Sequence, residues 1–116
     1  MKDRENTVLS KIIQYANEIN ETIIRFELDF DKFKNDNVMK NAICMCILQI
    51  GELVNHLPDE FKKKHDKAKW REIVSVRNRA VHAYETTDKE ILWDIASSDV
   101  PELKKYCEEI LKEKEI

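Results

Sequence analysis

Polar side chains that could act on a phosphodiester stand together in the stretch RNRAVHAYE, residues 77–85. Arg77 occupies a position where the helical periodicity of its neighbours predicts an apolar residue, and His82 follows five residues later. Arginine binds phosphoryl oxygens bidentately and neutralises charge that develops on them. Histidine can move a proton near neutral pH, for example that of an RNA 2′-hydroxyl. Asn78, one turn before His82, is placed to orient the imidazole.

The same residues also have a structural interpretation. Arg77 would pair with a carboxylate of the following helix, and His82 would cap the last turn of its own helix. A spacing of five does not align Arg77 and His82 on one helix face, although a long arginine near a fraying helix end could close the gap. Spacing alone leaves both interpretations open.

Two helices precede this stretch. Apolar residues at spacings of three and four predict a helix over residues 4–28 and a second over 36–56. The second is apolar on nearly every side, which is typical of the central helix of a bundle. Residues 29–36 (DFDKFKND) should break the helical pattern, and Asn35 or Asp36 would cap the second helix.

The second half of the chain predicts two further helices. Pro58 ends the second helix, because a residue before proline disfavours the helical region. After a lysine-rich link, Trp70 opens a third helix with one apolar stripe. A capping-box pattern at residues 87–90 (TDKE) opens the fourth, which continues to residue 111 with a kink or restart at Pro101.

Composition agrees with an all-α protein. One glycine and two prolines in 116 residues are too few turn residues for a sheet. We expect one domain over residues 1–116, folded as an up-and-down four-helix bundle. The N-terminus lacks the apolar run of a signal peptide and no apolar stretch looks long enough to cross a membrane, so a cytoplasmic protein is expected. The three cysteines lack metal-ligand spacing and should be reduced thiols, so neither a metal nor a cofactor is predicted.

Unusual residues interrupt the apolar second helix. Gly51 in its interior costs about 0.5–1 kcal/mol relative to alanine. Close approach of another helix, from this chain or from a second subunit, would explain it. Gln49, Glu52 and His56 form a polar line at spacings of three and four. Either they line a cleft opposite Arg77, with Glu52 pairing it, or they satisfy one another.

The charge of the chain is uneven. Residues 62–79 hold eight basic and two acidic side chains, net +6, whereas the whole chain carries −3. Such a segment can attract a polyanion locally, and Lys69, Arg71 and Arg79 are candidate RNA contacts. Alternatively these residues only keep a loop and a helix face solvated.

The motif formed by Arg77, His82 and Tyr84 resembles the RxxxxHxY motif of HepT-like toxins, a branch of the HEPN superfamily. The segments ILQIGELVNHLPDEF (residues 47–61) and WREIVSVRNRAVHAY (residues 70–84) also resemble that family, in the same order. The resemblance implies a helical homodimer with metal-independent endoribonuclease activity. It assigns catalysis to Arg77 and His82, and it makes Tyr84 the residue on which a nucleotidyltransferase (MntA-like) antitoxin places AMP.

Two functional hypotheses follow. In the first, the chain is an RNA-cleaving toxin, with Asn78 as the family's polar residue after the arginine and Glu52 as a supporting residue. In the second, a non-catalytic HEPN dimer binds a nucleotide or a nucleotidyltransferase partner through the same surface. The family has glycine between the histidine and the tyrosine, where this chain has Ala83. Alanine allows the helix to continue past His82, which changes where Tyr84 lies.

Overall fold

The computed structural model describes residues 2–66, 70–86 and 88–114. These residues form four long helices and several short ones. The all-α class is confirmed, because the secondary structure of these residues is entirely helical. The long helices are α1 (Lys2–Arg25), α3 (Asn37–Asn55), α5 (Trp70–Thr86) and α7 (Val100–Lys114). The short ones are α2 (Phe30–Lys34), α4 (Asp59–Lys64), α6 (Lys89–Asp94) and the π-helical turn η1 (Ile95–Asp99).

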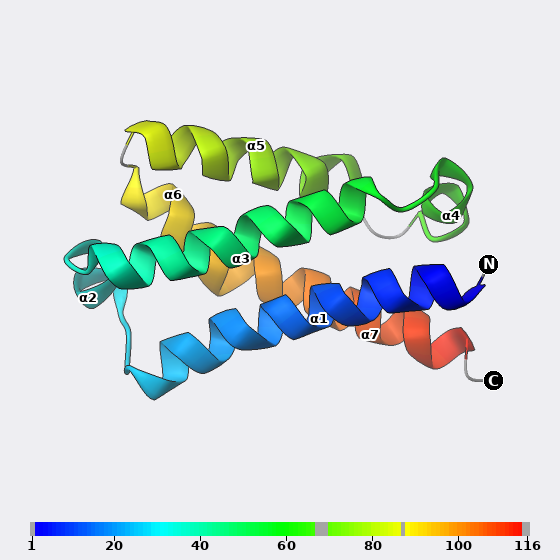
Figure 1. Cartoon of the computed structure of the whole chain (residues 1–116), viewed down its shortest axis with the longest axis horizontal. Coiled ribbons are helices and arrows are strands. Elements are labelled where there is room, and N and C mark those ends of the chain that lie inside the picture. Colours follow the sequence, from blue (N-terminus) through cyan, green and yellow to red (C-terminus); the bar gives the residue numbers. More distant parts are fainter. Residues whose placement is uncertain (1, 67–69, 87, 115–116) are drawn as a thin grey trace.

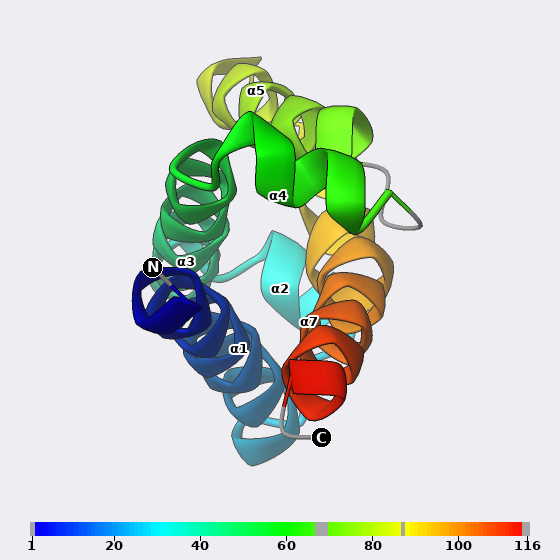
Figure 2. The ribbon, with the colours of Figure 1, turned by 90° about the vertical axis from the view of Figure 1, so that its right-hand side faces the viewer.

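The long helices run in alternating directions along a molecule of 44 × 27 × 20 Å (Figure 1). Helix α1 packs against α3 and α7, and α3 packs in turn against α5. Seen along the bundle, α5 lies at its outer edge beside α3 (Figure 2). Helix α5 packs chiefly against α3 and α6, so much of its surface faces away from the core.

Local signals set most helix ends. The Asp36 carboxylate accepts hydrogen bonds from the amides of Val38 and Met39 at 3.0 and 3.1 Å, which confirms its predicted cap. Asp88 caps α6 by accepting from the Ile91 amide at 3.2 Å. The predicted cap residue Thr87 lies outside the described residues. Helix α1 ends at Arg25, three residues before the end predicted at residue 28.

The segment 29–36 is not a plain break, which corrects the prediction. Asp29 caps the short helix α2, and this helix buries Phe33 completely, with its ring 5.2 Å from that of Trp93. The link after Pro58 likewise contains α4, which buries Phe61. One aromatic anchor in each short helix therefore supplies the burial that local periodicity does not reveal.

The kink or restart predicted at Pro101 takes the form of a π-helical turn, and the helical backbone continues through it without a break. Helix α6 passes into η1, and α7 begins at Val100. Proline has no amide hydrogen for the carbonyl of Ser97, and an inserted π turn accommodates such a gap. Asp99 of η1 forms an ion pair with Arg79 of α5 at 3.0 Å.

The core runs along the α1–α3–α7 contact. Trp70 anchors α5 to this core with only 6% of its surface exposed, and its indole donates to the His65 carbonyl at 2.9 Å. Trp93 packs against the core as a partly buried residue, so both tryptophans are core residues. The residues that α1, α3 and α7 bury here include Leu9, Ile12, Ala16, Ile19, Ile43, Ile47, Ile50, Val54, Leu103, Cys107 and Ile110.

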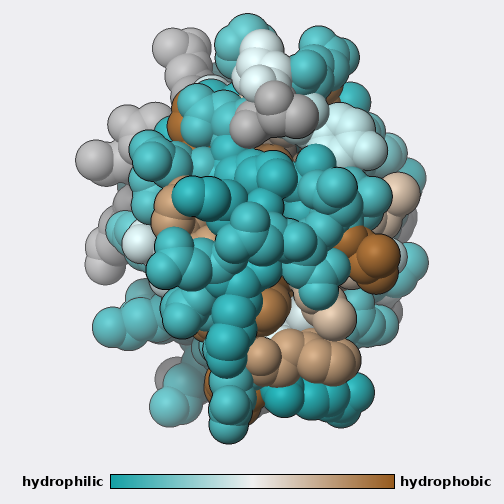
Figure 3. Space-filling model, turned by 90° about the vertical axis from the view of Figure 1, so that its left-hand side faces the viewer, coloured by the Kyte–Doolittle hydropathy of each residue, from teal (hydrophilic) through white to brown (hydrophobic). Residues whose placement is uncertain are grey.

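Helix α3 is long and apolar enough to cross a membrane by length and composition alone, contrary to the prediction that no such stretch exists. A core helix meets the same criteria, and α3 packs on one side against α1 and on another against α5. The end of the molecule that carries α2 is largely hydrophilic, with separate apolar groups (Figure 3).

Candidate functional site

Arg77 projects from α5 onto α3, where Gly51 makes room for it. A Cβ added to Gly51 would overlap the Cβ of Arg77 and would lie 2.9 Å from its Cγ and 3.2 Å from its Cδ. Only a residue without a side chain permits this approach. The helix that Gly51 admits is therefore α5 of the same chain, which decides between the two partners left open above.

Glu52 holds the other end of the arginine. Its Oε1 lies 2.6 Å from Arg77 Nε, and the two side chains are 44% and 40% exposed. The buried Nε makes no aligned hydrogen bond, so the contact is an ion pair. Among the described residues, the two terminal amino groups of Arg77 have no protein partner. They remain available to bind a phosphate bidentately.

The polar line on α3 is exposed or half-buried rather than buried. The Nδ1 of His56 lies 2.9 Å from the Glu52 carbonyl, and Gln49 contacts the Met45 sulfur at 3.9 Å. The described side-chain contacts of Gln49 and His56 therefore do not join the side chains of this line to one another. The ion pair of Glu52 with Arg77 favours the alternative in which the polar line faces Arg77.

His82 points away from Arg77. Five residues advance about 500° along a helix, which leaves the two side chains about 140° apart around α5. The helix continues in regular form to Thr86, so its end does not fray near His82. His82 is exposed, and its imidazole has no bonding partner in the part of the chain that the structure describes. Asn78 is exposed one turn away and makes no described hydrogen bond to it.

Tyr84 returns to the Arg77 side of α5. Seven residues advance almost two full turns, so Arg77 and Tyr84 share one helix face. Ala83 is completely buried in the core, and the helix runs through it as its identity allows. Tyr84 remains 45% exposed, and the Nζ of Lys40 lies over its ring, 5.1 Å from the centroid.

Lys40 is the residue that inspection of the sequence missed. It lies on α3, with 8% of its surface exposed, and is the buried charged residue of the described chain. A signal was present, because Lys40 shares a helix face with Cys44, Ile47 and Gly51 at spacings of four, three and four. Burial raises the pKa of the Cys44 thiol, and the nearby Lys40 ammonium opposes that rise.

The predicted RNA contacts are placed only in part. Arg79 is paired with Asp99 at 3.0 Å, with both side chains about half exposed. Lys69 and the side chain of Arg71 lie outside the described residues. Within the described ranges, no three His, Cys, Asp or Glu side chains gather to hold a metal ion.

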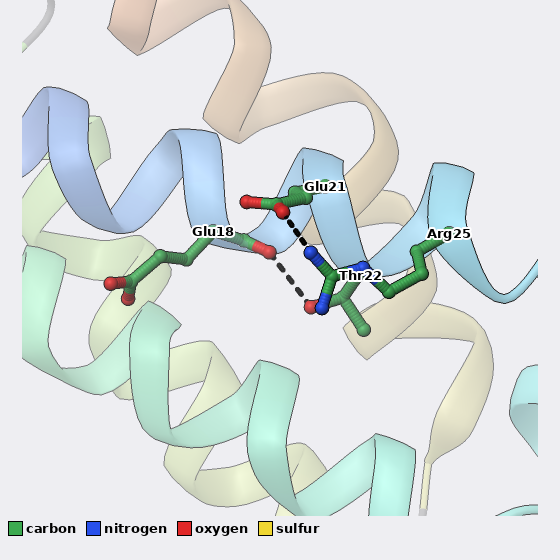
Figure 4. A network of polar contacts seen from close by, with 4 residues as sticks. All are labelled: Glu18, Glu21, Thr22 and Arg25. Carbon is green, nitrogen blue, oxygen red and sulfur yellow. Dashed lines mark hydrogen bonds and ion pairs between the residues drawn. The ribbon is translucent and has the colours of Figure 1, made fainter.

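A second polar cluster, formed by Glu18, Glu21, Thr22 and Arg25, lies on α1 (Figure 4). The Thr22 hydroxyl donates to the Glu18 carbonyl at 2.8 Å, and Arg25 pairs with Glu21 one turn away. These side chains line a shallow pocket at the exposed end of α1. Exposed pairs at this spacing contribute little and are ordinary helix surface.

Comparisons with known proteins agree with the motif. The family model described as "Ribonuclease HepT-like" matches residues 10–110, which include all of the site described above. The chain is 33% identical over 86 residues to a "Probable ribonuclease HepT" of Thermococcus cleftensis, covering 74% of this chain and 78% of that protein. No solved structure matches the chain.

Two further relatives extend this agreement. A "Putative RNase" of Caldanaerobacter subterraneus is 36% identical over 85 residues, which cover 73% of this chain and 76% of that protein. A "Putative RNase" of Methanocaldococcus jannaschii is 30% identical over 109 residues, which cover 92% and 90%. With most of its length matched by the family model and by these relatives, the chain belongs to the HepT-like ribonuclease family.

Proposed function

We propose that this protein is a metal-independent endoribonuclease toxin that acts as a homodimer. The observation that carries the proposal is the arrangement of Arg77. Its stem lies against Gly51, and its Nε pairs with Glu52. Its terminal amino groups have no described partner, and its own helix, α5, also carries the exposed His82. A fixed guanidinium with a free fork is suited to a phosphodiester.

The proposed reaction is an internal transesterification. The RNA 2′-oxygen attacks the adjacent phosphorus, the bond from phosphorus to the 5′-oxygen breaks, and the products are a 2′,3′-cyclic phosphate and a free 5′-hydroxyl. One proton leaves the 2′-hydroxyl and one reaches the departing 5′-oxygen. His82 performs one of these transfers, and Arg77 stabilises the charge that develops on the phosphoryl oxygens.

A second copy of the chain completes the site in this proposal. Arg77 faces α3 while His82 faces outward, so one copy does not direct both groups at the same phosphate. Val38, Met45 and Glu52 lie on one face of α3 at spacings of seven residues. Val38 is 74% exposed and Met45 is 57% exposed. The exposed apolar side chains of Val38 and Met45 are suited to a two-fold contact that brings His82 of one copy towards Arg77 of the other.

Substitution of the two proposed catalytic residues tests the activity. Arg77→Ala and His82→Ala should each reduce RNA cleavage by at least about 100-fold, because each removes charge stabilisation or proton transfer. Growth inhibition on expression should be lost in parallel. Arg25→Ala is the matched control, since it removes an exposed, ion-paired arginine from the distant surface of α1.

Cleavage should persist in excess chelator, because no step of the proposed reaction calls for a metal. Circular dichroism of each variant should retain the parent's helical signal. A folded Arg77→Ala or His82→Ala protein that cleaves RNA as the parent does would refute the assignment. A parent protein that binds RNA or nucleotide without cleaving it would instead support the non-catalytic HEPN dimer.

We further propose that a nucleotidyltransferase antitoxin silences the protein by adding AMP to Tyr84. The phenol oxygen attacks the α-phosphorus of ATP, pyrophosphate leaves, and the phenol proton passes to a base of the transferase or to water. Tyr84 is 45% exposed and lies on the helix face of Arg77, about 10 Å further along α5, so an AMP group attached to it would block the approach of RNA to Arg77. Co-expression with a nucleotidyltransferase antitoxin should place AMP on Tyr84, and Tyr84→Phe should escape both modification and silencing.

A further inference from the structure

Lys40 occupies an unusual environment at the junction of α3 and α5. Only 8% of the Lys40 surface is exposed, whereas Tyr84 is 45% exposed. The described side-chain contact of Lys40 is the face of the Tyr84 ring, with Nζ 5.1 Å from the ring centroid. No carboxylate lies within ion-pair distance of it among the described residues.

Among the described residues, the buried ammonium of Lys40 lacks the anionic partner that usually offsets the loss of its hydration. Lysine is seldom buried without an anionic partner, because its charge loses hydration. A cation–π contact contributes only about 0.5–2 kcal/mol, which is less than the several kcal/mol that it costs to remove an ammonium group from water. The Nζ lies over the ring of Tyr84, which is itself 45% exposed, so solvent ions can approach this side of the contact. An anion that arrives next to Tyr84 would therefore meet an available ammonium.

We propose that Lys40 is the residue that binds the phosphate of the AMP group on Tyr84, and that it positions the tyrosine before modification. This inference rests on the proposed regulation by a nucleotidyltransferase. The phosphodiester formed on the phenol oxygen carries one negative charge at the edge of the ring that Lys40 already covers. The four-carbon stem of lysine allows Nζ to follow that charge without moving α3.

The pairing would explain how modification acts on the fold as well as on the site. Lys40 belongs to α3 and Tyr84 to α5, so a phosphate between them adds an ion pair across the same helix contact that Gly51 and Arg77 form. The modified tyrosine would be held on the Arg77 face of α5. Modification should therefore stabilise the protein while it blocks the site.

The test compares Lys40→Met with Lys40→Arg in the full chain, using the transferase and ATP. Methionine keeps the length of the stem and removes the charge, whereas arginine retains the charge. Lys11→Met is the matched control, because Lys11 is an exposed lysine on α1. Two quantities are measured for each protein: the rate of AMP incorporation into Tyr84, and the change in Tm between the unmodified and the modified form.

We expect Lys40→Met to slow AMP incorporation by about tenfold and to abolish the rise in Tm on modification. Lys40→Arg should restore most of both quantities, and Lys11→Met should behave as the parent. A purely structural role of Lys40 would lower the Tm of both forms equally and leave the difference unchanged, which would overturn the inference. An equal rate and an equal rise in Tm in Lys40→Met would overturn it as well. Failure of the parent to carry AMP on Tyr84 would overturn the proposed regulation together with this inference.

Discussion

At the scale of single residues, the site depends on side chains of α5 that are held in place by residues of α3. Arg77 is held by Glu52 through an ion pair of 2.6 Å, and Tyr84 is covered by Lys40. His82 has no such support within the described chain and faces outward. Arg77 and Tyr84 are thus positioned by the fold, whereas His82, the proposed proton-transfer residue, is left for a substrate or a second copy to engage.

The buried thiols make a separate prediction at this scale. Burial raises the pKa of Cys107 to about 12, with a smaller contribution from Glu108. The native thiol therefore keeps its proton at a pH where the unfolded thiol has lost it. Stability from this group is present below about pH 8.5 and falls as pH rises from there towards 12, by up to roughly 1.4 kcal/mol per pH unit.

Urea unfolding at pH 7, 9 and 10 measures this loss. The parent should lose more stability between pH 7 and pH 10 than Cys107→Ala, although the variant starts lower because it leaves a cavity. The comparison between the two proteins cancels the titration of lysines, tyrosines and the other cysteines. Parallel losses in both proteins would show that Cys107 does not contribute.

At the scale of elements, the contact between α3 and α5 determines the geometry of the site. Gly51 allows the two helices to approach, and Arg79 ties the far side of α5 to η1 through Asp99. Helix α5 is therefore fixed on two sides, by α3 and by the π-helical turn. The continuation of α5 to Thr86 keeps Tyr84 on the same face as Arg77.

Gly51→Ala tests this contact. Alanine is favoured over glycine in a helix interior by about 0.5–1 kcal/mol. The new methyl group, however, would collide with the Cβ of Arg77, and overpacking typically costs about 1–3 kcal/mol. The collision should win, so we expect a net loss of about 1–2 kcal/mol by urea unfolding and a loss of RNA cleavage as Arg77 is displaced.

Ala42→Gly is the control for helix propensity, since Ala42 is exposed on the same helix. It should lose about 0.5–1 kcal/mol through propensity alone. If Gly51→Ala were more stable than the parent and cleaved RNA at the same rate, then the close approach of α3 and α5 would not determine the position of Arg77.

At the scale of the whole molecule, the bundle leaves one side incompletely covered. Helix α5 lies at the outer edge, and α3 exposes Val38 and Met45 beside it. We predict that a homodimer forms over this side. Met45→Lys should shift the protein towards the monomer in sedimentation experiments and should reduce cleavage, because the charge would be buried in the contact.

Mixing experiments test whether the two copies share a site. Arg77→Ala and His82→Ala proteins are each expected to be inactive, but mixed dimers would pair an intact arginine with an intact histidine. After exchange of subunits, cleavage should return to at most roughly a quarter of the parent rate, since half of the dimers are mixed and each has one complete site. A mixture that stays inactive, or a parent that sediments as a monomer at micromolar concentration, would contradict the shared site.

The sequence by itself determined the features that depend on neighbours within a few residues. Helical periodicity, the cap at Asp36 and the helical irregularity before Pro101 are all local, since they involve backbone groups three to five positions apart. The all-α class and the family motif were therefore predictable. The short helices α2 and α4 were missed because their stability comes from burying Phe33 and Phe61 against distant helices rather than from periodicity.

Only the tertiary structure decided which side chains meet. The sequence indicated that Gly51 admits a neighbouring helix, but not that Arg77 of the same chain lies there. It suggested Glu52 as one possible partner of Arg77, and it did not indicate that Lys40 covers Tyr84. These pairings depend on how apolar faces from separate segments pack together, and burial is a property of the whole core rather than of any one helix.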